Sequence, residues 1–377
     1  MKSLQSEKPE ISRLTFLFID SERRWRGGQA QLFTLLEGLH RRNHRVHLVC
    51  FPGTVLEARA ANLGISVHPV AIRSEAGLIS LFRLFAKLRQ TRPDILAFNT
   101  PKPILMGTLA ARFAPVGAEI VFRRVSFPLR RSFLSRLKYT WGIDRVVAIS
   151  RSIKAQLRSG GVPESAIEII YEGIAVEQYP EKPQELKHPG DGRIVVGTVS
   201  HLSSEKGIRY LVEAASLVRD ASSRVRFVIV GDGNRRRELQ ELVHHKKLDS
   251  CFEFLGFRED SHLVMKDFDI FVLPSLSEGL PSAIMEAMAH SLPVIGSHVG
   301  GIPELVEDGR TGLLVPPGDP ENLAKAIGKL AQDPDTMRQM GIRGRERLEE
   351  KFTLERKVVE TEALCHTLVG RNKRDRD

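Results

Sequence analysis

Residues 271–296 read FVLPSLSEGLPSAIMEAMAHSLPVIG, and this stretch predicts a strand, a loop, a helix and a second strand. Its apolar start has strand character and breaks at Pro274. Pro281 suits the first position of a helix, and the alanine- and methionine-rich segment after it favours one. Pro293 ends that helix, so the final Val-Ile-Gly can form another short buried strand. This alternation is typical of an α/β fold.

Two carboxylates, Glu278 and Glu286, stand in a fixed relation within this unit. A helix N-terminus offers free N–H groups and partial positive charge, which together bind phosphate. With a helix that starts near Pro281, Glu286 lies about 7 Å along it, and its side chain leans back toward the N-terminus. One carboxylate then flanks the anion site on each side and can accept hydrogen bonds from sugar hydroxyls. A nucleotide sugar fits this arrangement.

The segment SEGLPSAIMEAMAHSLPVIG resembles the E-x7-E segment of the retaining GT-B glycosyltransferases of family four. The resemblance implies that Glu278 binds the transferred sugar and that Glu286 binds the ribose of the nucleotide-sugar donor. It also implies that the amides of Gly279 and Leu280 lie near sugar or phosphate. The similarity is strongest over residues 197–317 and weak before Asp144.

The loop S-H-L-S-S-E-K-G at residues 200–207 resembles the family's G-R-L-x-x-x-K-G loop, whose Arg and Lys bind the diphosphate. Lys206 matches, whereas His201 stands in place of the Arg. Arg258 or an arginine of the N-terminal domain is the expected substitute. The predicted residues that bind the nucleotide-sugar donor are Gly28, His201, Lys206, Gly231, Gly256, Phe257, Glu278, Gly279, Leu280, Pro281 and Glu286, with Lys206 and Glu278 also catalytic.

A glycine pair, Gly27-Gly28, separates the first predicted strand, residues 14–19, from a leucine-rich helix. Glycines at such a place permit close approach of the backbone to a ligand, although a plain tight turn fits the pattern equally well. The pair is not a G-x-G-x-x-G fingerprint, which argues against a dinucleotide dehydrogenase.

The composition, with 42% hydrophobic and 27% charged residues among 377, is ordinary for a globular protein. No apolar run approaches the roughly 18 residues of a membrane span, and the first residues show no secretory signal. The cysteines Cys50, Cys251 and Cys365 lack metal or redox spacing and are interpreted as packing residues. We expect a cytoplasmic protein, peripheral on the inner face of the cytoplasmic membrane.

Charge is unevenly distributed along the chain. Residues 1–187 contain 29 Lys and Arg against 16 Asp and Glu, a net charge of +13, whereas the whole chain carries +10. Such asymmetry indicates an anionic partner for the first half. A basic, aromatic segment there predicts an anionic membrane or acceptor contact through Arg124, Arg130, Arg131, Arg136 and Lys138, although a basic helix packed on its own domain fits about as well.

The apolar stripe at residues 78–88 is interpreted as core packing, because that is the default for such a helix. The triplet Asp267-Phe268-Asp269 looks like a D-x-D metal motif, but it leads directly into an apolar strand, so we interpret it as a strand entrance.

The sequence therefore predicts an α/β protein of GT-B fold, with two Rossmann-like domains that face each other across a cleft. The predicted domains are residues 1–180, which bind the acceptor, and 181–350, which bind the nucleotide sugar; residues 351–377 form a helix that crosses back and a charged tail. The predicted reaction transfers a sugar, with retention, to an anionic envelope lipid or glycan. We expect no cofactor, metal or nucleic-acid partner. The alternatives are a sugar-nucleotide epimerase or hydrolase of this fold and a non-catalytic basic binding protein.

Overall fold

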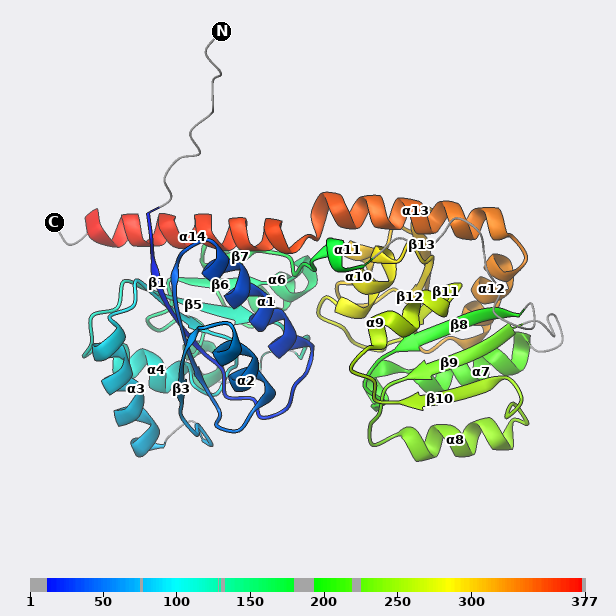
Figure 1. The fold of residues 1–377 in the computed structure, drawn as a ribbon, viewed down its shortest axis with the longest axis horizontal. Coiled ribbons are helices and arrows are strands. Elements are labelled where there is room, and N and C mark those ends of the chain that lie inside the picture. The colour runs from blue at the N-terminus through cyan, green and yellow to red at the C-terminus, as the bar shows by residue number, and fades with distance from the viewer. Residues whose placement is uncertain are drawn as a thin grey trace, which may run out of the picture.

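The chain forms two α/β domains, each built on one parallel sheet, in the computed structural model (Figure 1). The structure describes residues 12–74, 77–127, 129, 133–179, 193–218 and 225–374. Within them, the N-terminal sheet has the strand order β3-β2-β1-β4-β5-β6-β7 and the C-terminal sheet the order β10-β9-β8-β11-β12-β13. The predicted fold of two Rossmann-like domains is confirmed.

Strands and helices alternate in the N-terminal domain, because a parallel sheet needs a crossover between neighbouring strands. The strands are β1 (Thr15–Ile19), β2 (Arg45–Cys50), β3 (Ser66–Pro69), β4 (Ile95–Phe98), β5 (Ala118–Arg123), β6 (Arg145–Ala148) and β7 (Ile167–Ile169). The helices are α1 (Gly27–Arg41), α2 (Val55–Asn62), α3 (Leu78–Thr91), α4 (Ile104–Ala111), α5 (Phe133–Leu137) and α6 (Arg151–Ser159). Helices cover both faces of the sheet, which explains the continuous apolar sequence TFLFI of β1.

The C-terminal domain repeats this plan. Its strands are β8 (Ile194–Val199), β9 (Val225–Val230), β10 (Phe252–Gly256), β11 (Ile270–Leu273), β12 (Val294–Ser297) and β13 (Gly312–Val315). Its helices are α7 (Ile208–Val218), α8 (Arg236–His245), α9 (Ser261–Val264), α10 (Ser282–Ala289), α11 (Ile302–Leu305), α12 (Pro320–Ala331) and α13 (Pro334–Lys351). The predicted strand–loop–helix–strand unit is β11, α10 and β12, except that Pro281 is the N-cap residue, one position before the helix.

Both sheets reverse their winding direction at one place. In the N-terminal sheet β1 pairs with β2 on one side and β4 on the other, and in the C-terminal sheet β8 lies between β9 and β11. Ligands of open parallel sheets bind outside the carboxyl ends of the strands at such a switch point. The loops after β1, β4, β8 and β11 are therefore the places to look for a site.

The last helix, α14 (Leu354–Arg374), leaves the C-terminal domain and packs on the N-terminal domain (Figure 1). The chain passes between the domains where Ile174 N–H donates to Phe352 O at 3.1 Å and Leu354 N–H donates to Ile174 O at 2.8 Å. Farther along, Val358 packs so closely against α1 that a Cβ on Gly38 would lie 2.4 Å from its Cγ2. Residues 351–374 thus tie the second domain to the first.

The apolar stripe of α3 does not lie wholly in the core. Leu84 and Leu88 are fully buried, but Leu78 and Phe82 are each 69% exposed. The prediction of core packing is wrong for the outer half of this stripe. Elsewhere Cys50 and Cys365 lie in the core, as expected of packing residues, and Cys251 is half-buried.

Candidate nucleotide-sugar site

The loops at the carboxyl ends of the C-terminal sheet pack backbone to backbone. Gly207 has a φ of +64°, and a Cβ there would lie 2.0 Å from Pro274 O. Gly300 has a φ of +56°, and a Cβ there would lie 1.9 Å from Glu278 O. Only glycine fits such positions, because they combine left-handed backbone with a space too small for a methyl group. These contacts fix the loops that carry Lys206 and Glu278.

Lys206 and Glu278 form the centre of this site. Lys206 Nζ donates to Glu278 Oε1 at 2.7 Å, and Ser275 Oγ donates to the same oxygen at 2.7 Å. Glu278 is buried and Lys206 is half-buried, so both side chains are held where little solvent reaches the carboxylate. The sequence predicted each residue separately, and the structure joins them across 72 positions.

Glu286 lies on the first turns of α10, in a partly buried position. Desolvation raises the pKa of its carboxyl to about 7, although a hydrogen bond with Ser282 acts in the opposite direction. A carboxyl group with such a pKa changes its charge near neutral pH, which is a common property of residues in functional sites.

The N-termini of α1 and α10 face each other across the two domains. A Cβ on Gly27, the first residue of α1, would lie 4.0 Å from Ser282 Oγ at the start of α10. Among the described residues, no side chain caps either helix, and neither first turn contains an acidic residue. Two uncapped helix N-termini that converge from opposite domains favour an anion between them.

Arg124 follows β5 and lies close to Gly28 at the start of α1 and to Gly279 in the loop before α10. A Cβ on Gly28 would lie 4.0 Å from Arg124 Cδ, and one on Gly279 would lie 2.8 Å from Arg124 O. Its Nε donates to Glu172 Oε1 at 2.6 Å, its Nη1 donates to Asn99 Oδ1, and its side chain is only 6% exposed. In the part of the chain that the structure describes, its buried Nη2 has no hydrogen-bond partner.

Glu172 is shared by a second cation. Lys357 of α14 places its Nζ 2.6 Å from Glu172 Oε2, and both side chains are buried. Burial lowers the pKa of Lys357 to about 8, although the Glu172 carboxylate acts against this shift. The group of Arg124, Lys357 and Glu172 therefore has more positive than negative charge when both cations are protonated.

The structure corrects the prediction that Arg124 contacts a membrane or acceptor at the surface. Arg124 is buried in the network above, and Arg123 beside it donates to Tyr139 OH at 2.9 Å and to Phe127 O. The reason is that β5 extends to Arg123, so these arginines stand at a strand end and not on a helix. Arg136 is exposed and Lys138 is half-buried, whereas Arg130 and Arg131 lie outside the described residues.

The remaining predicted residues occupy the same edge of the C-terminal sheet. His201 is exposed at the start of the loop after β8, and Gly231 and Gly256 follow or end β9 and β10. Phe257 is 68% exposed, whereas Leu280 is buried beneath the site. Arg258, one suggested substitute for the missing arginine, is exposed and forms two 2.7 Å hydrogen bonds with Asp260.

The domains also touch through polar groups at the rim of this site. Ser126 Oγ and Ser277 Oγ lie 2.7 Å apart. Glu304 of α11 accepts from Arg151 N–H at 2.9 Å and Ser152 N–H at 3.2 Å, so that it caps α6 of the other domain. Tyr171 OH donates to the same carboxylate at 2.9 Å.

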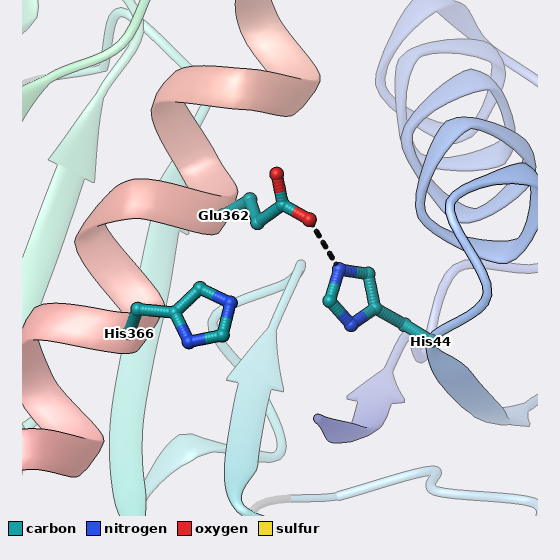
Figure 2. A group of neighbouring side chains, drawn as sticks. All are labelled: His44, Glu362 and His366. Atoms are coloured by element: carbon teal, nitrogen blue, oxygen red, sulfur yellow. Dashed lines mark hydrogen bonds and ion pairs between the residues drawn. The ribbon is translucent and has the colours of Figure 1, made fainter. Parts of the chain in front are cut away.

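One cluster of described residues brings three possible metal ligands together, far from this site in sequence: His44, Glu362 and His366 (Figure 2). His44 Nδ1 accepts from Leu14 N–H at 3.2 Å, which places the ring proton on Nε2, where it faces Glu362 Oε1 at 2.6 Å. A metal on Nε2 would have to displace that proton and compete with Arg42 for Glu362. The cluster fits an anchor for α14 better than a metal site.

The D-x-D-like triplet also has a structural role. Asp269 is buried at the start of β11, and its Oδ2 accepts from Val195 N–H at 2.8 Å, which joins the entrances of two neighbouring strands. This contact agrees with the interpretation as a strand entrance.

Several polar residues of the site were not predicted. Asp20 follows β1 and Asn99 follows β4. Glu172 accepts a hydrogen bond from Arg124, Glu304 caps α6, and Ser275 donates to Glu278. Glu172 lies after β7 and belongs to none of the motifs quoted above. The contacts of the others depend on which strands become neighbours.

Comparison with known proteins agrees with this architecture. Residues 25–178 match the family described as Glycosyltransferase Family 4, and residues 193–333 match the one described as Glycosyl transferases group 1. The solved structure of Anabaena Alr3699/HepE in complex with UDP and glucose superposes with a TM-score of 0.83 at 21% identity, covering 94% of this chain and 100% of that one. The molecule is therefore a GT-B fold protein.

Sequence relatives extend the match. The chain is 30% identical over 217 residues to the amylovoran biosynthesis glycosyltransferase AmsK of Erwinia amylovora, covering 55% of this chain and 53% of that one. It is 24% identical over 368 residues to the capsular polysaccharide biosynthesis glycosyltransferase CapM of Staphylococcus aureus, covering 89% of this chain and 93% of that one. The chain spans about half the length of AmsK. Family models match in both domains, so the chain is similar to group 1 glycosyltransferases along most of its length and has their GT-B fold.

Proposed function

We propose that this protein transfers a sugar, with retention, from a nucleotide diphosphate sugar to an anionic lipid or glycan of the cell envelope. The observation that carries the proposal is the convergence of two uncapped helix N-termini beside the Lys206–Glu278 pair. It supplies an anion site between two carboxylates, which is the chemistry that a diphosphate joined to two sugars requires. The complex of HepE with UDP and glucose supports this class of ligand.

The roles of the residues follow from their chemistry. Lys206 has three N–H donors, so its bond to Glu278 leaves others for a departing diphosphate. Glu278 accepts from sugar hydroxyls, and Glu286 accepts from the ribose when it is deprotonated. The reaction breaks the bond between the anomeric carbon and the diphosphate and forms one to the acceptor oxygen on the same face. The leaving diphosphate takes the acceptor's proton, and no enzyme nucleophile or metal is needed.

Arg124 supplies the positive charge that His201 does not. It is the buried arginine between the Gly28 and Gly279 loops, and its Nη2 is the nitrogen left without a described partner. Glu172 and Asn99 hold the other guanidinium nitrogens, so the group is positioned before the nucleotide sugar arrives. Arg258 is less suitable, because Asp260 already occupies its fork.

The acceptor class rests on charge and on relatives. Residues 1–187 carry a net +13, which favours an anionic partner for the N-terminal domain. AmsK and CapM are named for biosynthesis of surface polysaccharides, and the same class of product is proposed here. The place of action would be the cytoplasmic face of the membrane.

A panel of nucleotide sugars tests the proposal. Melting temperature should rise with one nucleotide diphosphate and its sugars, and that donor should release its nucleotide faster when a lipid-linked or lipopolysaccharide acceptor is added. A product with the inverted anomeric configuration would refute retention. Conversion of the sugar nucleotide without any acceptor would instead favour the hypothesis that the protein is a sugar-nucleotide epimerase or hydrolase. Absence of any nucleotide-sugar binding would favour a basic binding protein.

A further inference from the structure

Two neighbouring helices of the N-terminal domain expose large apolar side chains. On α3, Leu78 is 69%, Ile79 71% and Phe82 69% exposed. On and just after α4, which packs against α3, Leu109 is 40% and Phe113 70% exposed. We call these five residues the α3–α4 apolar surface. Single exposed apolar residues are normal, but a group of this size on packed neighbours marks an interaction site.

Helical geometry explains why α3 has two apolar faces. At about 100° per residue, Leu84 and Leu88 lie on one side and are fully buried in the domain core. Leu78 and Phe82 are four residues apart, so they lie side by side on the other side, and Ile79 borders them. The outer face is thus apolar over the first turns of the helix, and in the part of the chain that the structure describes it stays exposed.

The charged residues of α3 itself are all basic, and α4 has none. Arg83 and Arg89 are exposed on α3, and Arg112 is exposed beside Phe113. Arg112 also lies over Trp141, with its guanidinium carbon 5.5 Å from the ring centroid, which connects α4 to another partly exposed aromatic residue. Apolar residues among cations match the headgroup layer of an anionic bilayer.

The two helices lie on the side of the N-terminal domain away from the candidate site. Figure 1 shows α3 and α4 on the part of the N-terminal domain that lies away from the C-terminal domain. None of the helices that the structure describes is long and apolar enough to cross a membrane.

We infer that the α3–α4 apolar surface docks this protein on an anionic lipid bilayer. The inference deepens the proposed function, because it brings the N-terminal domain to the place where a lipid-linked acceptor would lie. It also moves the predicted membrane contact from Arg124, which is buried, to α3 and α4. The contact combines insertion of Leu78, Ile79 and Phe82 with attraction of the surrounding arginines.

Vesicle sedimentation tests the inference with the full chain. Vesicles of equal parts phosphatidylglycerol and phosphatidylcholine should bind the protein, whereas pure phosphatidylcholine vesicles should not, and added salt should weaken binding. Replacing Leu78, Ile79 and Phe82 together with Ser should lower the partition coefficient at least about tenfold. Replacing Arg83 and Arg89 with Gln should lower it about fivefold for each cation removed. The side chains replaced in these two variants are exposed, so the melting temperature of each variant should equal that of the parent chain.

A matched control uses exposed leucines of the other domain. Leu217 and Leu263 are 53% and 45% exposed, and their joint replacement with Ser should leave vesicle binding unchanged. Equal loss in this control, equal binding to both vesicle types, or no binding by the parent chain would overturn the inference. So would a change from dimer to monomer in the triple Ser variant with vesicle binding intact, because a second copy would then be the occupant. Nucleotide-sugar binding, measured separately, reports on the proposed function and not on docking.

Discussion

At the scale of single residues, the raised pKa of Glu286 makes a pH-dependent prediction. The carboxyl is neutral below about pH 7 and charged above it, and the charged form is the better acceptor for ribose hydroxyls. Affinity for a nucleotide diphosphate sugar, whose phosphates do not titrate near neutrality, should therefore rise between pH 6 and pH 8. Glu286→Gln should remove this dependence and weaken binding by about 1–3 kcal/mol in calorimetry at pH 8. Unchanged affinity in the variant would contradict the ribose assignment.

Lys206 should act mainly in the transition state, because negative charge grows on the diphosphate as the glycosidic bond breaks. Lys206→Ala should lower the rate of nucleotide release at least about tenfold. Lys246→Ala, at an exposed site after α8, is the matched control and should turn over at the parental rate. His201→Arg in the parent chain tests whether the positive charge around the diphosphate is incomplete. If it is incomplete, the added arginine should raise turnover.

Arg124 and Arg258 make a second matched pair. Arg124→Gln should reduce turnover at least about tenfold, because the variant loses the charge that Glu172 and Asn99 position. Arg258→Gln should have no effect, because that side chain is exposed and paired with Asp260. Arg124→Lys separates charge from geometry, since it keeps the cation but loses the fork. Equal turnover in parent and Arg124→Gln, with the fold intact by melting, would assign Arg124 a structural role only.

These residues show what the sequence could and could not reveal. Glu278, Glu286 and Lys206 belong to local motifs, so the sequence singled them out, the two glutamates by their spacing and Lys206 by the resemblance of its loop. Arg124 was misplaced because a run of arginines among apolar residues fits an amphipathic helix, whereas here a strand ends within it. Its partners Asn99 and Glu172 come from other strands, and only the order of the sheet brings them together.

At the scale of elements, α14 contacts the N-terminal domain through one buried carboxylate, Glu362, and one exposed carboxylate, Glu355. Arg42 bonds to Glu362, which is 5% exposed, and to Glu355, which is 72% exposed. Glu362→Ala leaves His44 and Arg42 without their buried partner and should lower the free energy of unfolding by about 3–5 kcal/mol. Glu355→Ala should cost at most about 1 kcal/mol. Urea unfolding of both variants checks the contrast, and equal losses would mean that the anchor lies elsewhere.

Helix α3 shows the limit of periodicity at this scale. Its pattern predicted an apolar stripe, of which Leu88 is buried and Leu81 and Phe85 pack against the core. Periodicity cannot say how wide a stripe the domain covers, because that depends on neighbouring elements such as helix α4. The predicted alternation of strands and helices, by contrast, needed no such knowledge, since buried parallel strands are recognisable from their own sequence.

At the scale of the whole molecule, Glu304 links the two domains at the rim of the candidate site. Its carboxylate caps α6 and accepts from Tyr171, while its backbone carbonyl is held separately by Arg347 Nη2 at 2.8 Å. Glu304→Ala therefore removes these contacts between the domains and leaves the local backbone in place. Hydrogen bonds to a charged group contribute about 1.5–3 kcal/mol each. Their loss should make an arrangement in which the two domains have moved apart at least tenfold more populated.

Small-angle scattering measures this opening directly. Glu304→Ala should have a larger radius of gyration than the parent chain, and saturating nucleotide diphosphate should reduce the difference, because the proposed ligand site includes groups from both domains. Glu253→Ala, which removes an exposed carboxylate of the same domain, should scatter like the parent. If Glu304→Ala also scatters like the parent and binds nucleotide equally well, then Ser126, Ser277 and the buried polar layer around Arg124 suffice to hold the domains together, and Glu304 serves only as a helix cap.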